Sequence, residues 1–350
     1  MHFRKNILSL ATYKPPLSNR INSGMHLMDF NERSSALSEA ILVKLESWCR
    51  EGLTHIYPDY SGLIEKISEY TNVSEKNIFL GNGSDQIIDC VMRAVLDQNE
   101  KVLIPKPSFA MFSQLANLTE AEIIYYDILH EDPFIEIQKK LDMGVRMVLM
   151  CQPNNPTGRY LDPKKITKMI KNYKKTWFFI DEAYFEFSGD TQLDYVSNYD
   201  NLVISRTFSK AFGLAALRLG YMVSSEKMIE QCSKIRGPYD INQFACYAAQ
   251  VVLDQVDEIK SYAKNVMEIN KPLIEEALLS KNIKFMPSKA NFLNIVDELD
   301  LADHFSNNEV RVRKMSQPEL KNSFRISIGD EAITAMTIKL IESYQKSNIA

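Results

Sequence analysis

Between residues 78 and 224 the chain alternates short runs that are apolar or aromatic at every position with longer amphipathic stretches. Successive side chains of a strand point to opposite faces, so a run that is apolar throughout needs cover on both faces. Parallel strands joined by helices provide that cover. The pattern therefore predicts an α/β fold with a mostly parallel sheet between layers of helices. The runs are 78–80, 102–104, 123–126, 147–150, 177–180 and 202–204.

The last third of the chain has a different pattern. From Asn242 to about residue 280 the apolar residues recur at helical spacing. Short apolar runs near Phe285, at 292–295 and at 324–328 then precede a closing helix, which is typical of a smaller α+β unit. We therefore expect a large domain over 46–254 and a small C-terminal domain over 255–350. Residues 1–45 are expected to pack on the small domain.

Composition narrows the classes of function. The chain has 41 basic and 45 acidic residues and a net charge of −4, whereas nucleic-acid binders usually carry a basic surface. No apolar run reaches the length of a membrane span. The five cysteines are widely spaced and form no CxxC pair, so we expect neither a metal site nor a disulfide framework. A soluble protein of the reducing cytoplasm fits this composition best.

Ligands of open α/β sheets bind outside the carboxyl ends of the strands, and one glycine-rich turn lies at such a place. Residues 81–85, Gly-Asn-Gly-Ser-Asp, follow the first apolar run and precede a helical pattern. The N–H groups of a helix start suit an anion, although a plain tight turn with Ser84 or Asp85 as helix cap is the simpler interpretation. Gln86 stands at the last glycine position of GxGxxG, so a dinucleotide fingerprint is absent and a nicotinamide dehydrogenase is disfavoured.

Three further strand ends carry polar residues. A rigid turn at 151–158 would hold the amide of Asn155, although it could be only a turn. Asp181 closes an apolar run, where a carboxylate is costly unless it meets a cation or donors or caps a helix. Lys210 follows another run, and an apolar setting would lower its pKa and make it a nucleophile for a carbonyl, although most lysines lie at the surface. Hydroxyl and guanidinium groups that suit a phosphate accompany it at Thr207, Ser209 and Arg218.

Taken together, these parts are what pyridoxal phosphate requires. Its aldehyde needs an amine, its ring nitrogen a carboxylate, its phenolic oxygen hydrogen-bond donors, and its phosphate N–H groups and a cation. No single motif points to this cofactor, but the set of strand-end residues does.

The chain resembles the fold-type I pyridoxal-phosphate enzymes of the class I and II aminotransferase group over nearly its full length. The resemblance rests on Asn-Asn-Pro-Thr-Gly at 154–158, Asp-Glu-Ala-Tyr at 181–184, and Ser-Lys-Ala-Phe-Gly-Leu at 209–214 with Arg218. Within the group it is most similar to the histidinol-phosphate aminotransferases. It shares with them the motifs at 57–59, 81–85, 181–187, 206–215, 236–242, 290–292 and 324–329. The resemblance implies a large domain with a mostly parallel seven-stranded sheet, a smaller α+β domain, and a homodimer.

The resemblance also implies roles for individual residues. Lys210, Asp181 and Tyr184 would be catalytic: Lys210 would form the Schiff base and move the proton, Asp181 would pair with the ring nitrogen, and Tyr184 would bond the phenolic oxygen together with Asn155. Phe109 would stack on the ring, and Tyr57 would reach the phosphate in the neighbouring subunit's site. The phosphate would be held by Ser84, Asp85, Thr207, Ser209 and Arg218.

For the substrate, the resemblance implies an anion site at Arg325, completed by Arg313 unless that residue is a strand-edge surface arginine, with Asn155 beside them. The implied reaction converts histidinol phosphate and 2-oxoglutarate to imidazole acetol phosphate and glutamate. The family usually has Asn-Glu-Asn-Pro near the N-terminus, where this chain has Asn-Glu-Arg-Ser at 31–34, and this departure concerns the substrate more than the reaction. Alternatives are an aminotransferase for aromatic amino acids or for another small phosphorylated amine or ketone, a phospho-amino-acid decarboxylase, and a non-catalytic regulator.

Overall fold

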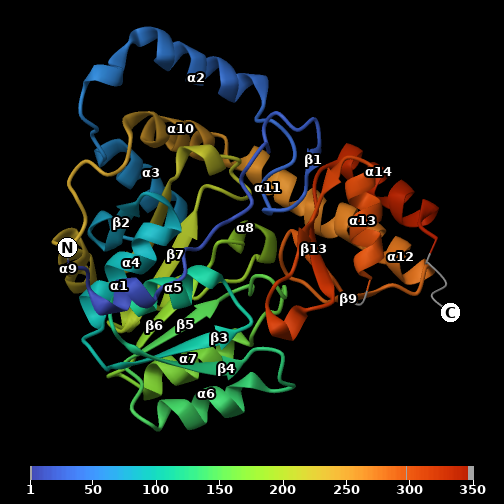
Figure 1. Cartoon of the computed structure of the whole chain (residues 1–350). Coiled ribbons are helices and arrows are strands. Elements are labelled where there is room, and N and C mark those ends of the chain that lie inside the picture. The colour runs from blue at the N-terminus through green and yellow to red at the C-terminus, as the bar shows by residue number, and fades with distance from the viewer. Residues whose placement is uncertain (1, 297, 346–350) are drawn as a thin grey trace.

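The computed structural model describes residues 2–296 and 298–345. Its centre is a seven-stranded sheet in the order β2-β8-β7-β6-β5-β3-β4 (Figure 1). Only β8 runs antiparallel to its neighbours, so the predicted mostly parallel sheet is confirmed, and each of the six apolar runs lies in one of its strands. The strands are β2 (Ile78–Gly81), β3 (Lys101–Lys106), β4 (Glu122–Asp127), β5 (Met147–Cys151), β6 (Trp177–Asp181), β7 (Leu202–Thr207) and β8 (Gly220–Ser224).

Helices cover both faces of this sheet, as the apolar runs require. In β6, Phe179 belongs to the core on one face, while its neighbours Phe178 and Ile180 belong to the core on the other. This alternation is the period-2 geometry of a strand that is buried on both sides. One layer contains α4 (Gly83–Val95), α5 (Ala110–Leu118) and α9 (Glu226–Ser233), and the other α3 (Ser61–Thr71), α6 (Pro133–Leu141), α7 (Pro163–Asn172) and α10 (Gln243–Asp254).

A smaller unit follows α10. Its antiparallel sheet has the order β12-β13-β10-β9, and Figure 1 shows it with its helices at the right, in orange and red. The long helical stretch is divided into α11 (Val256–Asn265), a π-helical turn (Val266–Asn270) and α12 (Lys271–Ser280), because Pro272 lacks the N–H that a regular α-helix would use there. The other elements are β9 (Lys284–Met286), β10 (Phe292–Val296), α13 (Leu299–Asn307), β11 (Val310–Arg311), β12 (Arg313–Lys314), β13 (Ser323–Ser327) and α14 (Glu331–Ser343).

The N-terminal segment contacts both units. Strand β1 (His26–Leu27) pairs in parallel with β11 of the small unit. Helix α2 (Glu39–Glu51) instead lies over α10, where the Trp48 and Phe244 rings are 5.2 Å apart (Figure 1). The predicted boundary at residue 45 falls inside α2, so the division into 1–45, 46–254 and 255–350 stays a prediction. Shorter helices are α1 (Lys5–Ser9), α8 (Phe185–Ser188) and the 3-10 turns Leu53–His55, Glu75–Asn77, Leu193–Asn198, Ala215–Leu217 and Pro318–Leu320.

Three further observations concern membrane-spanning helices, metal sites and cysteines. Among the described helices, none combines the length and the apolar character that crossing a membrane requires. Within 2–296 and 298–345, no three His, Cys, Asp or Glu side chains are grouped to hold a metal ion. All five cysteines are free thiols, and every one except Cys49 is buried, where a thiol packs as a small apolar side chain.

Candidate functional site

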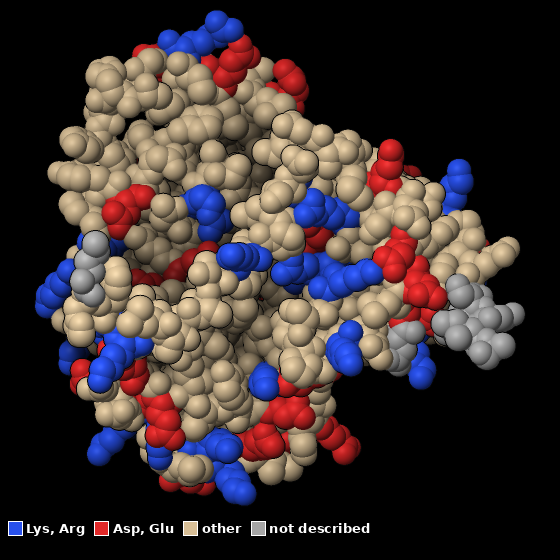
Figure 2. All heavy atoms as spheres, in the orientation of Figure 1, with Lys and Arg blue, Asp and Glu red and all other residues tan. Residues whose placement is uncertain are grey.

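The carboxyl ends of the parallel strands meet at one edge of the sheet, and the polar motifs found there line a single cavity. β2, β5, β6 and β7 each deliver one of these motifs, because each motif directly follows its strand. On the face shown in Figure 2, Lys and Arg side chains gather across the middle of the molecule, where the large and small units meet. The cavity is lined by Ser84, Asp85, Phe109, Cys151, Asn155, Asp181, Ala183, Tyr184, Thr207, Ser209, Lys210 and Arg218.

Lys210 lies in this cavity with its amine withdrawn from water. Burial, followed by the nearby positive charge of Arg325, lowers the pKa of Lys210 to about 8. Its Nζ donates a hydrogen bond of 2.7 Å to the main-chain oxygen of Phe30. The amine is thus neutral at a much lower pH than an exposed lysine, which is the condition for attack on a carbonyl.

Asp181 ends β6 and is buried. Burial is the main cause that raises the pKa of Asp181 to about 7, and hydrogen bonds from Ser205 and Ala183 only partly oppose it. The Ser205 hydroxyl and the Ala183 N–H both donate to the same oxygen, Oδ1, at 3.1 and 3.2 Å. The second oxygen, Oδ2, is left for a donor or cation inside the cavity, so capping the following turn is only part of what this carboxylate can do.

The glycine-rich turn places a helix N-terminus at the cavity wall. Helix α4 begins at Gly83, and its N-cap residue Asn82 makes no side-chain capping bond. The simpler interpretation, in which Ser84 or Asp85 caps the helix, is therefore wrong for this chain. The first N–H groups of α4 remain available to an anion.

Arg218 adds a cation beside this turn. Its NH2 group donates to Asp85 Oδ2 at 3.2 Å, and its backbone has a left-handed φ of 53°. Gly83, with φ of +75°, lies so close that a Cβ there would be 2.5 Å from the Arg218 NH2 group. A side chain at this position would therefore displace the guanidinium from the turn. Thr207 and Ser209 line the same cavity, and the Thr207 hydroxyl accepts a hydrogen bond of 3.1 Å from the Ser209 N–H.

Hydrogen-bonding side chains line the other wall. The Tyr184 hydroxyl accepts a hydrogen bond of 2.9 Å from Asn31 Nδ2, and burial raises its pKa. Arg325 donates to Asn155 Oδ1 and, at 2.6 Å, to the main-chain oxygen of Asp29. Because its oxygen is engaged, Asn155 can offer its amide N–H groups to a ligand. The aromatic ring of Phe109 closes the wall at the start of α5.

Three predicted residues lie outside the cavity lining: Arg325, which contacts the lining residue Asn155, and Tyr57 and Arg313. Tyr57 is 74% exposed and stacks on Tyr239, with ring centroids 4.4 Å apart. Arg313 pairs across the strands with Arg325, and its guanidinium lies 5.7 Å from the centroid of the Phe30 ring. The short strand β12 that carries Arg313 is an edge strand, but the side chain points toward the N-terminal segment.

The sequence analysis did not identify some residues in or beside the cavity. Cys151 ends β5 at the register position of Asp181, and burial raises the pKa of its thiol, so the wall is neutral there. The strand-end rule that found Asp181 would have found Cys151 as well. By contrast, no local pattern indicated that Phe30 and Asn31 would contact Lys210 and Tyr184, because these pairs are far apart in the sequence.

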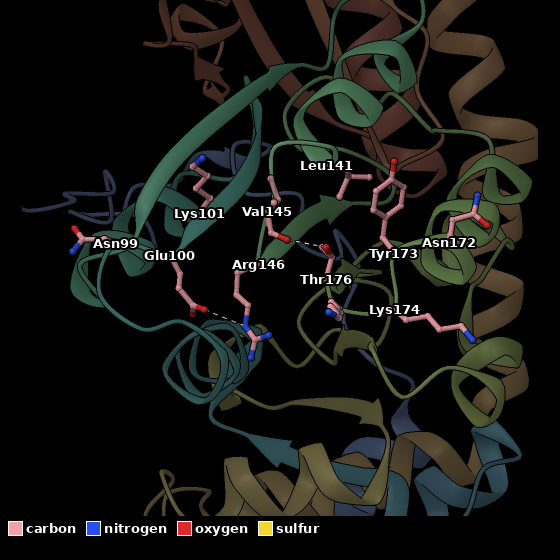
Figure 3. Close-up of a pocket in the computed structure, with 12 residues that line it drawn as sticks. Asn99, Glu100, Lys101, Leu141, Val145, Arg146, Asn172, Tyr173, Lys174 and Thr176 are labelled. Carbon is pink, nitrogen blue, oxygen red and sulfur yellow. Dashed lines mark hydrogen bonds and ion pairs between the residues drawn. The ribbon is translucent and has the colours of Figure 1, made fainter.

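A larger hollow lies at the opposite ends of the strands, around the starts of β3, β5 and β6 (Figure 3). Several of its polar groups are engaged by neighbouring protein atoms: Arg146 pairs with Glu100 at 3.5 Å, and the Thr176 hydroxyl donates to the Val145 oxygen at 2.7 Å. Lys101 donates to the main-chain oxygen of Met143. The smaller cavity instead gathers titratable and hydrogen-bonding side chains from four strand ends, so it is the candidate site.

Comparisons with known proteins show which family the chain is similar to. The family model "Aminotransferase class I and II" matches residues 28–340. A histidinol-phosphate aminotransferase of Thermoanaerobacter sp. (strain X514) is 36% identical over 276 residues, covering 76% of this chain and 77% of the relative. One of Caldanaerobacter subterraneus subsp. tengcongensis is 33% identical over 317 residues, covering 89% and 88%. The crystal structure of histidinol-phosphate aminotransferase from Sinorhizobium meliloti in complex with pyridoxal-5'-phosphate has the same fold, with a TM-score of 0.85, 20% identity and coverage of 97% and 96%.

Proposed function

Since the chain belongs to the class I and II aminotransferases, we propose that it transfers an amino group from histidinol phosphate to 2-oxoglutarate, giving imidazole acetol phosphate and glutamate. The chain is a pyridoxal-phosphate-dependent aminotransferase, and the reaction belongs to histidine biosynthesis. The observation that carries the proposal is the cavity in which a lysine of lowered pKa, a buried carboxylate and an uncapped helix start face one another.

The donor set of the cavity fits each part of the cofactor. The amine of Lys210 suits the aldehyde, and the carboxylate of Asp181 suits a protonated ring nitrogen, whose positive charge would keep this buried group ionised. The hydroxyl of Tyr184 and the amide of Asn155 suit the phenolic oxygen. The phosphate would be held by the start of α4 with Ser84 and Asp85, and by Thr207, Ser209 and Arg218.

When bound, pyridoxal phosphate supplies an electron sink for the bonds at the substrate carbon. The protein's own residues do the rest. We assign to Lys210 Nζ the transfer of the proton between the substrate carbon and the cofactor, which needs the neutral amine that burial provides. Phe109 would restrict the ring to one plane. Arg325 and Arg313 would receive the anionic end of the substrate, which is a carboxylate in one half-reaction and a phosphate in the other.

The test is a screen of single half-reactions. The purified protein is loaded with pyridoxal phosphate, and histidinol phosphate, glutamate, phenylalanine and a small phosphorylated amine are added separately while the cofactor absorbance is followed. We expect histidinol phosphate and glutamate to bleach the absorbance. If only phenylalanine or the other phosphorylated amine bleached the absorbance, that compound would be the substrate in place of histidinol phosphate. Release of carbon dioxide from a phospho-amino acid would show that the enzyme is a decarboxylase and not an aminotransferase.

We further propose that the enzyme is a cytoplasmic homodimer with shared active sites. Ile56 and Tyr239, which lie beside Tyr57, are large and exposed, and so are Leu42 and Val43 of the preceding helix α2. A second copy would cover this surface and bring Tyr57 to the phosphate of the neighbouring site. The buried free thiols fit a reducing compartment. Sedimentation of the protein as a monomer at working concentration would contradict the dimer.

A further inference from the structure

Three consecutive residues of the N-terminal segment contact three polar groups of the active site. We call residues 29–31 the strap. Each strap residue makes one of the contacts, and the departure of this chain from its family, at Arg33 and Ser34, lies just beyond the strap. The contacts are Arg325 NH2 to the Asp29 oxygen at 2.6 Å, Lys210 Nζ to the Phe30 oxygen at 2.7 Å, and Asn31 Nδ2 to the Tyr184 hydroxyl at 2.9 Å.

Asn31 is buried, and hydrogen bonds to the small unit hold its main chain. It is 1% exposed, and its N–H donates to the Ser327 hydroxyl at 2.9 Å. Its main-chain oxygen accepts from Asn291 Nδ2 at 3.2 Å. Its φ of 56° is in the left-handed region, where asparagine is one of the few side chains that fit at low cost. The small unit therefore fixes the amide that meets Tyr184, on the large unit.

We propose that Asn31 is a positioning residue that directs the Tyr184 hydroxyl proton into the cavity. A tyrosine hydroxyl has one proton to donate. Because Asn31 Nδ2 donates to this hydroxyl, the proton of Tyr184 is left for another acceptor. The inference rests on the proposed function, in which that acceptor is the phenolic oxygen of pyridoxal phosphate. A donor held at this oxygen stabilises its ionised form and lowers the pKa of the bound chromophore.

Two substitutions at this position separate orientation from shape. Asn31→Gly deletes the amide and tolerates the left-handed backbone, so it removes the donor without strain. Asn31→Asp keeps the shape but offers an acceptor, which turns the Tyr184 proton away from the cofactor. A residue needed only for packing would tolerate the similar shape of aspartate better than the loss of the side chain. A residue that directs the proton should show the opposite order.

The measurement is the pH titration of the cofactor absorbance, with the dissociation constant of pyridoxal phosphate determined alongside. We expect the chromophore pKa to rise by about 1 in Asn31→Gly, as loss of one hydrogen bond implies, and further in Asn31→Asp. Cofactor binding should weaken about tenfold in Asn31→Gly. Asn19→Gly is the matched control, because Asn19 has the same φ of 56° in the same segment but is exposed.

A second comparison tests whether Asn31 acts through Tyr184. In a Tyr184→Phe background, Asn31→Gly should cause no further change in the chromophore pKa. A further rise of the same size there, or an unchanged chromophore in both Asn31 variants, would overturn the inference. Failure of the unmodified protein to bind pyridoxal phosphate would instead refute the proposed function. The result that refutes the role of Asn31 therefore differs from the result that refutes the function.

Discussion

Arg325 of the small sheet donates a hydrogen bond to the side-chain oxygen of Asn155, which follows β5 of the large sheet. The contact joins the large and small units at the edge of the candidate site. It occupies the oxygen of Asn155 and leaves its N–H groups available. In the function proposed above, one arginine would thereby connect the binding of the substrate to the arrangement of the cofactor site.

Arg325→Lys should impair both half-reactions, because lysine keeps the charge but cannot bind a carboxylate in a fork and still reach Asn155. We expect kcat/KM to fall about 10- to 100-fold for glutamate and for histidinol phosphate alike. Steady-state kinetics with each substrate check this, with Arg93→Lys as an exposed control. A loss confined to one substrate would show that the two anions use different sites.

The lowered pKa of Lys210 predicts the pH dependence of cofactor attachment. The amine is protonated below about pH 8 and neutral above it, so the rate at which the apoprotein takes up pyridoxal phosphate should rise through that pH and then level off. With an exposed lysine the rate would keep rising toward the ordinary lysine pKa of about 10. Stopped-flow absorbance over this range measures the rate, with Lys210→Ala as the blank.

The same shift makes a prediction about stability. The unfolded chain binds a proton at Lys210 up to its ordinary pKa of about 10, whereas the folded chain releases it at about pH 8. Because the unfolded state binds more protons between these values, this group should make the apoprotein more stable as the pH rises through that window. Urea unfolding of the parent and Lys210→Met at both ends of the window measures the difference, and an equal pH dependence in the two proteins would contradict it.

Gly83→Ala should weaken cofactor binding beyond its cost in backbone strain. The new Cβ would lie 2.5 Å from the Arg218 NH2 group and displace the guanidinium from the start of α4. The control is Gly144→Ala, where φ is similarly positive, at +79°, but no atom lies within 4 Å. Both should lose about 1 kcal/mol of stability, while only Gly83→Ala should raise the dissociation constant of the cofactor, by about tenfold or more. Equal cofactor affinity in the two variants would show that Arg218 does not hold the phosphate.

Arg206 and Glu182 form a buried ion pair beside the cavity, with side chains only 3% and 2% exposed. Arg206 also lies over the Phe185 ring, with its guanidinium 3.5 Å from the ring centroid. Removing one partner leaves a buried charge, so Arg206→Met should destabilise the protein by about 3 to 5 kcal/mol. The exposed pair of Arg93 and Asp89 is the control, because Arg93→Met should cost less than about 1 kcal/mol. Denaturant unfolding of both variants makes the comparison.

Much of this site follows from local sequence. Asp181 and Lys210 could be placed because each follows an apolar strand, and parallel strands end at one edge of the sheet. Ser84 and Asp85 could be placed for the same reason, although whether either capped α4 depended on geometry that only the structure shows.

The remaining contacts depend on how distant segments pack. Asn31 meets Tyr184 only because β1 pairs with β11 and carries the N-terminal segment over the sheet edge. The position of Arg313 likewise depends on the register of two short strands, which no periodicity specifies. The role of Tyr57 depends on a second subunit, so it stays a prediction.

The most direct test of the central claim is to locate the cofactor on the chain. The protein loaded with pyridoxal phosphate is reduced with borohydride, digested with trypsin and mapped by mass spectrometry. We expect a pyridoxyl group on Lys210 and none at that position in Lys210→Ala. A label on another lysine, or no label on the unmodified protein, would contradict it.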